Sequence, residues 1–229
     1  ALVDGEHAVL LPSSQDHKRI FDGDKGLNTG GMGAYSPAPM ENADFRKTVL
    51  EHILNPTLAE LRRRGIKYHG ILYGGLIITS EGIKVLEFNC RFGDPESQVV
   101  LPRLGCNLLP ILEACIDGTL DDKHISLRNE HCVCVIIAAG GYPKSYHKGD
   151  VIKGLNEVEN MENVLVFHAG TKQVEKCIIT DGGRILGVTA LGADLVSAAS
   201  LAYRAVFKIR FNNMHFRRDI AARGLKKIK

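Results

Sequence analysis

The segment KVLEFNCRFGDPE, residues 84–96, constrains the fold most, because it begins as an ordinary buried strand and continues into charged residues. Successive side chains of a β-strand point to opposite faces. The alternation therefore predicts an apolar face made of Leu86, Phe88 and Cys90 and a polar face made of Glu87, Asn89 and Arg91. Side chains two residues apart lie about 6.6 Å from each other along a strand, which suits groups that converge on one ligand.

The predicted polar face has the chemistry of a nucleotide site. Glu87 and Asn89 offer hard oxygen ligands, which Mg²⁺ prefers when substrate phosphates complete its coordination shell. Arg91 can bind phosphate oxygens through two parallel hydrogen bonds. The pattern predicts a site where a metal and a cation stabilise a transferring phosphoryl group. The alternative is an ion pair between Glu87 and Arg91 on a solvated sheet face, and spacing alone does not separate the two.

Residues 15–39 form a polar, glycine-rich stretch that we predict to be a long loop with little periodicity. Compact domains rarely keep such a loop unless it is functional or disordered. Asp16 and the cationic run His17-Lys18-Arg19 precede Thr29-Gly30-Gly31-Met32-Gly33, and glycines let backbone amides approach an anion closely. The stretch matches neither the Walker A motif nor the dinucleotide fingerprint. A flexible surface loop is the alternative.

The rest of the chain predicts an α+β fold. Before residue 119 the patterns indicate a hairpin, a helix broken near Pro56, two strands and two short helices, over residues 1–14, 43–64, 70–79, 83–90, 98–104 and 108–116. Strand-like runs follow a polar segment at 119–130, and a helix is predicted at 194–209. We therefore predict a domain at 1–127 with an antiparallel sheet and helices, and a small, β-rich α+β domain at 128–229.

Composition excludes several classes of protein. The net charge of +3 over 229 residues is too small to indicate a nucleic-acid partner. Six cysteines without metal or redox spacing predict reduced, mostly buried thiols. Neither a signal peptide nor an apolar run of membrane-spanning length is visible, so we expect a cytoplasmic protein without a membrane partner. The chain starts without Met inside a strand–turn–strand pattern, which indicates a piece of a longer polypeptide.

Four stretches together resemble one family: QDHKRIFDGDKGLNTGGMGAYSPAP, GILYGGL, VLEFNCRFGDPE and GGRILGVTALG. Over the whole chain, the sequence is similar to the glycinamide ribonucleotide synthetases of the ATP-grasp superfamily. The resemblance implies an ATP-grasp carboxy-terminal subdomain at 1–127, followed by a carboxy-terminal synthetase domain. It implies the ATP-dependent ligation of glycine to 5-phosphoribosylamine through glycyl phosphate, in purine biosynthesis, with ATP and Mg²⁺ or Mn²⁺ as cofactors.

The resemblance also implies roles for individual residues. Glu87 and Asn89 would be the metal ligands, and Arg91 and Lys18 would be the catalytic residues. Asp94 and Glu96 close the motif and would orient Arg91 or the substrate amine. Contacts to substrates or phosphates are implied for Asp16, His17, Arg19, Asn28, Gly30, Gly31, Gly33, Asp94 and Glu96.

The same resemblance implies that further chain is needed. The family begins with an amino-terminal portion that binds phosphoribosylamine and clamps the adenine, so the present residues are expected to be inactive alone. Downstream purine-synthesis domains are expected if the chain comes from the trifunctional form found in animals. Two alternatives stay open: another ATP-grasp carboxylate–amine ligase, or a non-catalytic structural module of a multifunctional protein.

Overall fold

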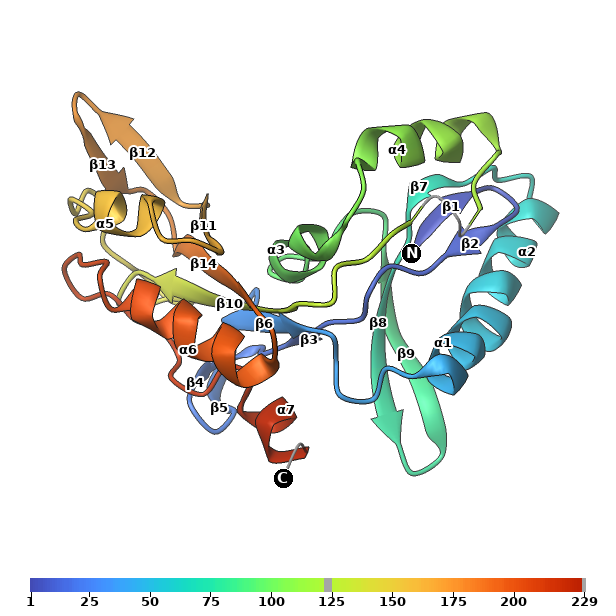
Figure 1. The fold of residues 1–229 in the computed structure, drawn as a ribbon, viewed down its shortest axis with the longest axis horizontal. Helices are drawn as coiled ribbons and strands as arrows, with labels where there is room; N and C mark the ends of the chain where they lie inside the picture. Colours follow the sequence, from blue (N-terminus) through green and yellow to red (C-terminus); the bar gives the residue numbers. More distant parts are fainter. Residues whose placement is uncertain (122–124, 228–229) are drawn as a thin grey trace. The chain divides into compact units, whose positions relative to one another are not determined.

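The computed structural model describes residues 1–121 and 125–227, and it confirms a mixed fold of helices and antiparallel sheets (Figure 1). The residues group into two compact units. Unit 1 contains residues 1–13, 40–93 and 104–128, and unit 2 contains residues 14–39, 94–103 and 129–229. Two segments that precede residue 127 therefore fold with the carboxy-terminal half. The predicted sequence domains, 1–127 and 128–229, stay a prediction.

Unit 1 combines a small sheet, a two-stranded ribbon and helices around an apolar core. The sheet has the order β2-β1-β7, and the ribbon pairs β8 with β9. The strands are β1 Leu2–Asp4, β2 Ala8–Val9, β7 His69–Ile71, β8 Tyr73–Thr79 and β9 Gly82–Asn89. The helices are α1 Ala43–Val49, a π-helical turn Leu50–Leu54, α2 Asn55–Arg63 and α4 Leu108–Asp117. The predicted hairpin and the predicted helices of this unit are confirmed. Pro56 lies in the first turn of α2, where its missing N–H is tolerated.

The ribbon corrects one expectation about residues 84–96. The register of β8 and β9 shifts between Gly75 and Leu76, because Leu86 is an extra residue on β9. The prediction that Leu86 and Phe88 are buried is wrong, since they are 68% and 41% exposed. Alternation identifies which side chains share a face, but it does not say whether that face is covered. Within the described part of the chain β9 pairs with β8 alone.

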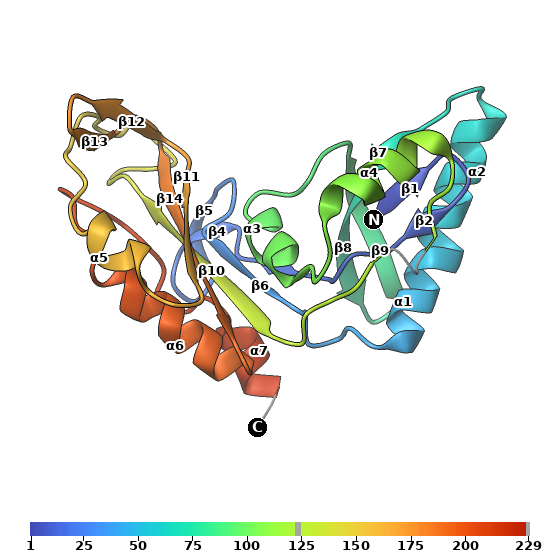
Figure 2. The same ribbon diagram turned by 45° about the horizontal axis from the view of Figure 1, so that its top comes forward.

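Unit 2 is built on a five-stranded antiparallel sheet with the order β11-β14-β10-β6-β3. Its strands are β3 Gln15–Asp16, β6 Gly33–Ser36, β10 His131–Ala138, β11 Val164–His168 and β14 Arg184–Gly192. Helix α6, Leu195–Val206, lies beside β10 and β14 in both ribbon views (Figure 1 and Figure 2). The helix contributes Ala198, Ala202 and Ala205 to the core, and these small side chains allow close packing against the sheet.

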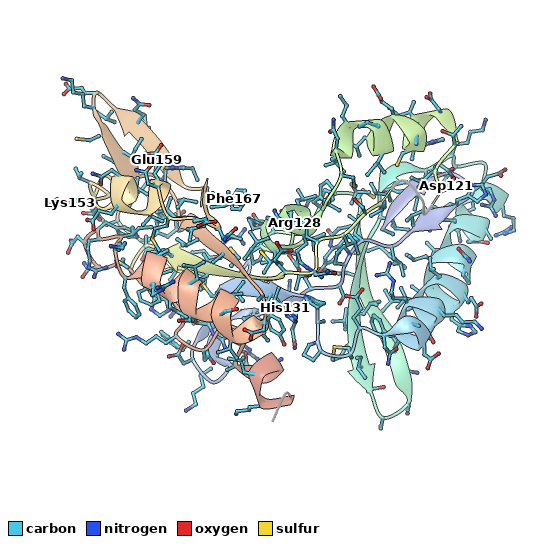
Figure 3. The ribbon with its side chains drawn as sticks, viewed as in Figure 1. Asp121, Arg128, His131, Lys153, Glu159 and Phe167 are labelled. Atoms are coloured by element: carbon cyan, nitrogen blue, oxygen red, sulfur yellow. The ribbon has the colours of Figure 1, made fainter. Side chains whose placement is uncertain are left out.

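Shorter elements surround this sheet. They are the ribbon β4 Arg19–Phe21 with β5 Lys25–Asn28, the ribbon β12 Thr171–Val174 with β13 Cys177–Thr180, α3 Ser97–Val100 with a 3-10 turn at Leu101–Arg103, α5 Leu155–Glu159 and α7 Ala222–Lys227. Strand β11 lies at the edge of the sheet, and its Phe167 stays 36% exposed (Figure 3). The central strands β10 and β14 are almost wholly buried, which explains their nearly continuous apolar sequences.

The prediction of a long loop at residues 15–39 is wrong, because the segment contains β3, β4, β5 and β6. Strand β6 is buried along its whole length and lies between β10 and β3. Its sequence, GAYS, has no hydrophobic alternation, since three small residues and the large Tyr35 are all buried in it. Such a strand is invisible to a search for periodicity.

The cysteines and the helices bear on two further expectations. All six cysteines are free, but only Cys115, Cys132 and Cys134 are buried, so the predicted burial holds for half of them. Burial raises the pKa of the Cys134 thiol to about 12, which makes it unreactive at neutral pH. None of the helices in the described residues has the length and the hydrophobicity that spanning a bilayer requires.

Candidate functional site

The predicted site residues fall into two groups. Unit 1 holds Glu87, Asn89 and Arg91, at the end of β9 and directly after it. Unit 2 holds the others, which come from β3, from the ribbon β4–β5 and its flanks, and from the turn before α3: Asp16, His17, Lys18, Arg19, Asn28, Gly30, Gly31, Gly33, Asp94 and Glu96.

In unit 2 the ribbon β4–β5 brings two stretches of the predicted site together. The backbone N–H of His17 donates to Gly33 O at 2.9 Å, and the N–H of Met32 donates to His17 O at 2.9 Å. The N–H of Thr29 donates to Lys18 O at 2.8 Å. The stretch before the ribbon and the glycine segment after it therefore run side by side.

Arg19 and Asn28 lie opposite each other on the ribbon itself. They are paired across β4 and β5, and both are exposed. Arg19 Nη1 donates to Gly26 O at 2.6 Å. Arg19 thus helps to close the ribbon, and its contact with a substrate stays a prediction.

Gly31 packs against the turn that contains Asp94-Pro95-Glu96. Its φ is +114°, and a Cβ at this position would lie 2.3 Å from Pro95 Cδ and 2.8 Å from Asp16 Oδ1. No side chain fits at such distances, and the backbone conformation itself favours glycine. The glycine segment is therefore needed for close contact between two of the stretches that carry predicted site residues.

The backbone amides of this segment already have acceptors. The N–H of Gly30 donates to Tyr142 Oη at 3.0 Å, and the N–H of Gly31 donates to Thr29 Oγ1 at 2.9 Å. Because Met32 donates to His17, three successive amides are occupied inside the protein. The sequence suggested that free backbone amides of this segment bind an anion. The amides of Gly30, Gly31 and Met32 are not free, so this reason does not hold for them. Contact of the segment with a substrate stays a prediction.

Asp16 and Glu96 place two carboxyl groups in the interior of the same unit. Glu96 is 7% exposed. Asp16 Oδ1 accepts a hydrogen bond from the His17 N–H at 2.6 Å, and Oδ2 lies 3.4 Å from Lys18 Nζ but accepts no hydrogen bond within the described residues. Burial, reinforced by the neighbouring Glu96, raises the pKa of Asp16 to about 6. Such a carboxyl group is suited to receive a cationic group of a ligand.

His17 is a neutral, buried side chain rather than a cation. It is 2% exposed, and Nδ1 lies 3.2 Å from Gly33 O. Burial, aided by the charge of Arg217, lowers the pKa of His17 to about 4. Because the carbonyl of Gly33 must accept, Nδ1 carries the proton and Nε2 is an acceptor at neutral pH. His17 therefore offers no positive charge to a phosphate.

Two residues of the site were assigned no role by the sequence. Arg184 Nη1 donates to Gly30 O at 2.9 Å, and Arg184 Nη2 lies 2.8 Å from Asp94 Oδ2. Tyr142 accepts from the Gly30 amide, as described above. Together they hold the glycine segment and Asp94. The signal for Arg184 was its place in GGRILGVTALG, directly after two glycines.

In unit 1 the predicted polar face of β9 is present. Asn89 Nδ2 lies 3.3 Å from Glu87 Oε1, so the two side chains converge. Arg91 Nη1 donates to Phe92 O at 2.7 Å, and no ion pair joins Arg91 to Glu87 among the described residues. One carboxylate and one amide oxygen fit a divalent cation that is held largely by phosphates. Residues 1–121 and 125–227 contain no cluster of three His, Cys, Asp or Glu side chains that could hold a metal unaided.

Replacing Asp16 by Asn is expected to stabilise the protein in a pH-dependent way. The raised pKa means that the folded state disfavours the carboxylate, so the penalty is present above about pH 6 and absent below about pH 4. The variant should gain at most about 3 kcal/mol at pH 8, from a shift of about two pKa units. His17 gives the opposite pH dependence, and it does so equally in the unmodified protein and in the variant. Because its pKa is lowered, the free energy of unfolding decreases as pH falls from 6.5 towards about 4.

Urea unfolding of both proteins from pH 4 to pH 8 measures this effect, and the difference between them isolates Asp16. A difference that is constant across this range would contradict the raised pKa.

Comparisons with known proteins find relatives that align along nearly the whole chain. The family described as "Phosphoribosylglycinamide synthetase, ATP-grasp (A) domain" matches residues 1–97. The family described as "Phosphoribosylglycinamide synthetase, C domain" matches residues 132–223. A phosphoribosylamine–glycine ligase of Synechocystis is 52% identical over 227 residues, which cover 98% of this chain and 54% of that protein. The ligase of Allochromatium vinosum is 47% identical and is covered to 53%, with 98% of this chain aligned. The chain thus spans about half the length of the curated relatives it matches.

Solved structures give the same result. The crystal structure of phosphoribosylamine–glycine ligase from Thermotoga maritima matches with a TM-score of 0.86 and 33% identity, over 96% of this chain and 54% of that one. Biotin carboxylase from Campylobacter jejuni, with a TM-score of 0.57 and 14% identity over 81% of this chain and 40% of that one, shares the fold alone. Since the two family matches together take in most of the sequence and relatives align along nearly all of it, the chain belongs to the phosphoribosylglycinamide synthetase family.

Proposed function

We propose that the protein containing this chain ligates glycine to 5-phosphoribosylamine with ATP, giving glycinamide ribonucleotide, ADP and phosphate. The observation that carries the proposal is the 52% identity, along 98% of this chain, to a protein named phosphoribosylamine–glycine ligase. The site supports it, because both units present groups suited to the charges of the reactants.

The proposed reaction has two steps. A carboxylate oxygen of glycine attacks the γ-phosphorus of ATP, ADP leaves, and glycyl phosphate forms. The nitrogen of phosphoribosylamine then attacks the acyl carbon, the C–O bond to phosphate breaks, and the nitrogen loses a proton to solvent. Both steps concentrate negative charge on phosphoryl oxygens, so catalysis depends on fixed cations and on positioning.

In this proposal the residues of unit 1 stabilise the transferring phosphoryl group. Arg91 would bind its oxygens through the guanidinium group. Glu87 and Asn89 would hold Mg²⁺ or Mn²⁺ through their side-chain oxygens, and the two side chains lie close together, with Asn89 Nδ2 3.3 Å from Glu87 Oε1. The bound ion would neutralise charge on the phosphates of ATP.

The residues of unit 2 would bind the other reactants. Lys18 is exposed beside Asp16 and would contact the reacting phosphate or carboxylate. Asp16 and Glu96, with Asp16 lacking a hydrogen bond at Oδ2, would receive the substrate amine. Arg19, Asn28, Asp94 and the glycine segment would line the same region.

Phosphate release by the full-length protein tests the proposal. ATP, phosphoribosylamine and Mg²⁺ are supplied with glycine or, in parallel, with alanine, serine or bicarbonate. Glycine should give the highest rate, and the product should have the mass of glycinamide ribonucleotide. A faster reaction with another carboxylate would identify a different ATP-grasp ligase, and no turnover with any of them would identify a non-catalytic module.

We also propose that residues 1–229 do not complete this reaction alone. The relatives that carry the ligase name are about twice as long as this chain, which covers only about half of their length. The same phosphate assay on the 229 residues and on the full-length protein compares the two directly. Turnover by the 229 residues at a similar rate would refute this part of the proposal.

A further inference from the structure

Arg217 carries a buried positive charge that the proposed reaction does not use. Its side chain is 1% exposed, and all three guanidinium nitrogens are bonded. Nε and Nη2 donate to the two oxygens of Asp219 at 2.7 and 2.8 Å. Nη1 donates to Asp24 Oδ1 at 3.0 Å and to the backbone carbonyl of Arg19 at 3.1 Å. Burying a guanidinium is costly, and this arrangement is stable only because every donor nitrogen has a partner.

Each partner of Arg217 either belongs to the ribbon β4–β5 or is bonded to it. Asp24 lies in the turn of the ribbon with φ of 55°, and Arg19 begins β4. Asp219 also accepts from the N–H of Gly23 at 2.8 Å. The segment 215–219 thus binds the ribbon through hydrogen bonds to both its side chains and its backbone.

Neighbouring residues of the same segment make further hydrogen bonds to the ribbon. The N–H of Arg218 donates to Asp22 Oδ1 at 2.8 Å, and His215 Nε2 lies 2.9 Å from Ile20 O. On the other side, Tyr203 of α6 holds the segment, because its hydroxyl donates to Arg217 O at 3.0 Å and accepts from the Ile220 N–H at 2.9 Å. The helix, the segment and the ribbon are therefore linked in series.

The ribbon has a few other contacts, since the exposed Arg223 also pairs with Asp24 and Phe21 packs edge-on against His215. Ile20 is its one buried side chain, and the four residues of β5 are exposed. Its two ends, however, lead directly into Asp16–Lys18 and Thr29–Gly33, which are bonded to each other. Movement of the ribbon would shift both stretches together.

We infer that Arg217 is a positioning residue, which fixes the substrate-binding stretches 16–18 and 29–33 by anchoring the ribbon β4–β5 through Asp24 and Arg19. This inference rests on the proposed function, since it assigns those stretches to substrate binding. It adds a residue from the carboxy-terminal segment that reaches the site only through other groups.

Hydrogen exchange and kinetics of the full-length protein test the inference with a matched pair of variants. Arg217→Gln removes the anchor, whereas Arg218→Gln removes an adjacent, exposed arginine whose backbone alone contacts the ribbon. In Arg217→Gln, the amides of Thr29, Gly31 and Met32 should exchange about ten- to a hundredfold faster, as expected for losing hydrogen bonds to a charged group. Amides of β10 and β14 should be accelerated less than those of the loop, by no more than the measured loss of global stability accounts for.

The kinetic readout is a split between KM and kcat, measured well below the unfolding temperature. Arg217→Gln should raise the KM for phosphoribosylamine or glycine about tenfold or more, with a smaller change in kcat, since the binding stretches lose their order. Arg217→Lys should recover part of this loss, and Arg218→Gln should resemble the unmodified protein.

The outcomes separate the inference from the proposed function. Equal acceleration of exchange in the ribbon and in β10, or unchanged KM and unchanged loop exchange, would refute the positioning role. If the unmodified protein does not ligate glycine, the proposed function fails, and hydrogen exchange still decides whether Arg217 anchors the stretches. If Arg217→Gln does not fold, Asp24→Asn replaces it, because asparagine tolerates the positive φ and leaves Arg217 paired with Asp219. That variant should show the same local effect, and its absence would refute the inference.

Discussion

Replacing Glu87 by Gln in the full-length protein is expected to lower kcat about a hundred- to a thousandfold, while the unfolding temperature changes by less than about 2 °C. The carboxylate is exposed, and its described contact is the one with Asn89, so little stability depends on its charge. A neutral amide, by contrast, binds a divalent cation weakly and leaves phosphate charge uncompensated. Phosphate release and thermal unfolding measure the two quantities, and raising the Mg²⁺ concentration should recover part of the rate.

Glu81 provides a matched control for this variant. It is an exposed glutamate at the turn of the same ribbon, and its carboxylate lies 3.2 Å from Lys84 Nζ. Glu81→Gln makes the same chemical change outside the proposed site, so kcat and the unfolding temperature should both be retained. A Glu87→Gln variant that kept its turnover and lost stability would instead assign Glu87 a structural role.

Replacing Gly31 by Ala is expected to reduce the free energy of unfolding by about 2–6 kcal/mol. Two separate effects contribute. The backbone at φ of +114° is strained for any residue with a side chain, and the new Cβ would lie 2.3 Å from Pro95 Cδ and 2.8 Å from Asp16 Oδ1. Relief of the clash must move the glycine segment away from the carboxylates, so the folded variant should also bind substrates more weakly. Urea unfolding and the KM values measure these losses.

Gly149 separates backbone strain from the steric clash. Its φ is +95°, and a Cβ there would meet no atom within 4 Å. Gly149→Ala should therefore show only the cost of the backbone conformation, about 1–3 kcal/mol, with unchanged KM values. Equal losses in the two variants would show that contact between Gly31 and Pro95 contributes nothing to stability.

The sequence predicted the elements whose patterns are local. The helix around Pro56 and the helix that begins after Asp194 follow from spacing within a few residues, and the structure confirms both. Metal binding by Glu87 and Asn89 stays a prediction, because convergence of side chains does not identify a ligand.

What the sequence did not predict depends on contacts between distant residues. Strand β6 exists because β10, about a hundred residues later, pairs with it, and its own sequence carries no alternation. The neutrality of His17 results from its burial, although its neighbours in the sequence suggested a solvated cation. Tyr142 and Arg184 reach Gly30 from 112 and 154 positions later in the chain, and only Arg184 carried a local signal, the two glycines before it.

The contacts of residues 215–219 with the ribbon β4–β5 have a consequence for the synthesis of the protein on the ribosome. Gly23 and Asp219 are 196 positions apart, so the ribbon leaves the ribosome long before its anchor is made. At about 5–20 residues per second, that interval lasts on the order of ten to forty seconds. Throughout it the two stretches of the proposed site stay without their fixed geometry, and nascent chains that stop short of Arg217 would keep them so. Maturation of the site is therefore tied to the synthesis of residues 215–219.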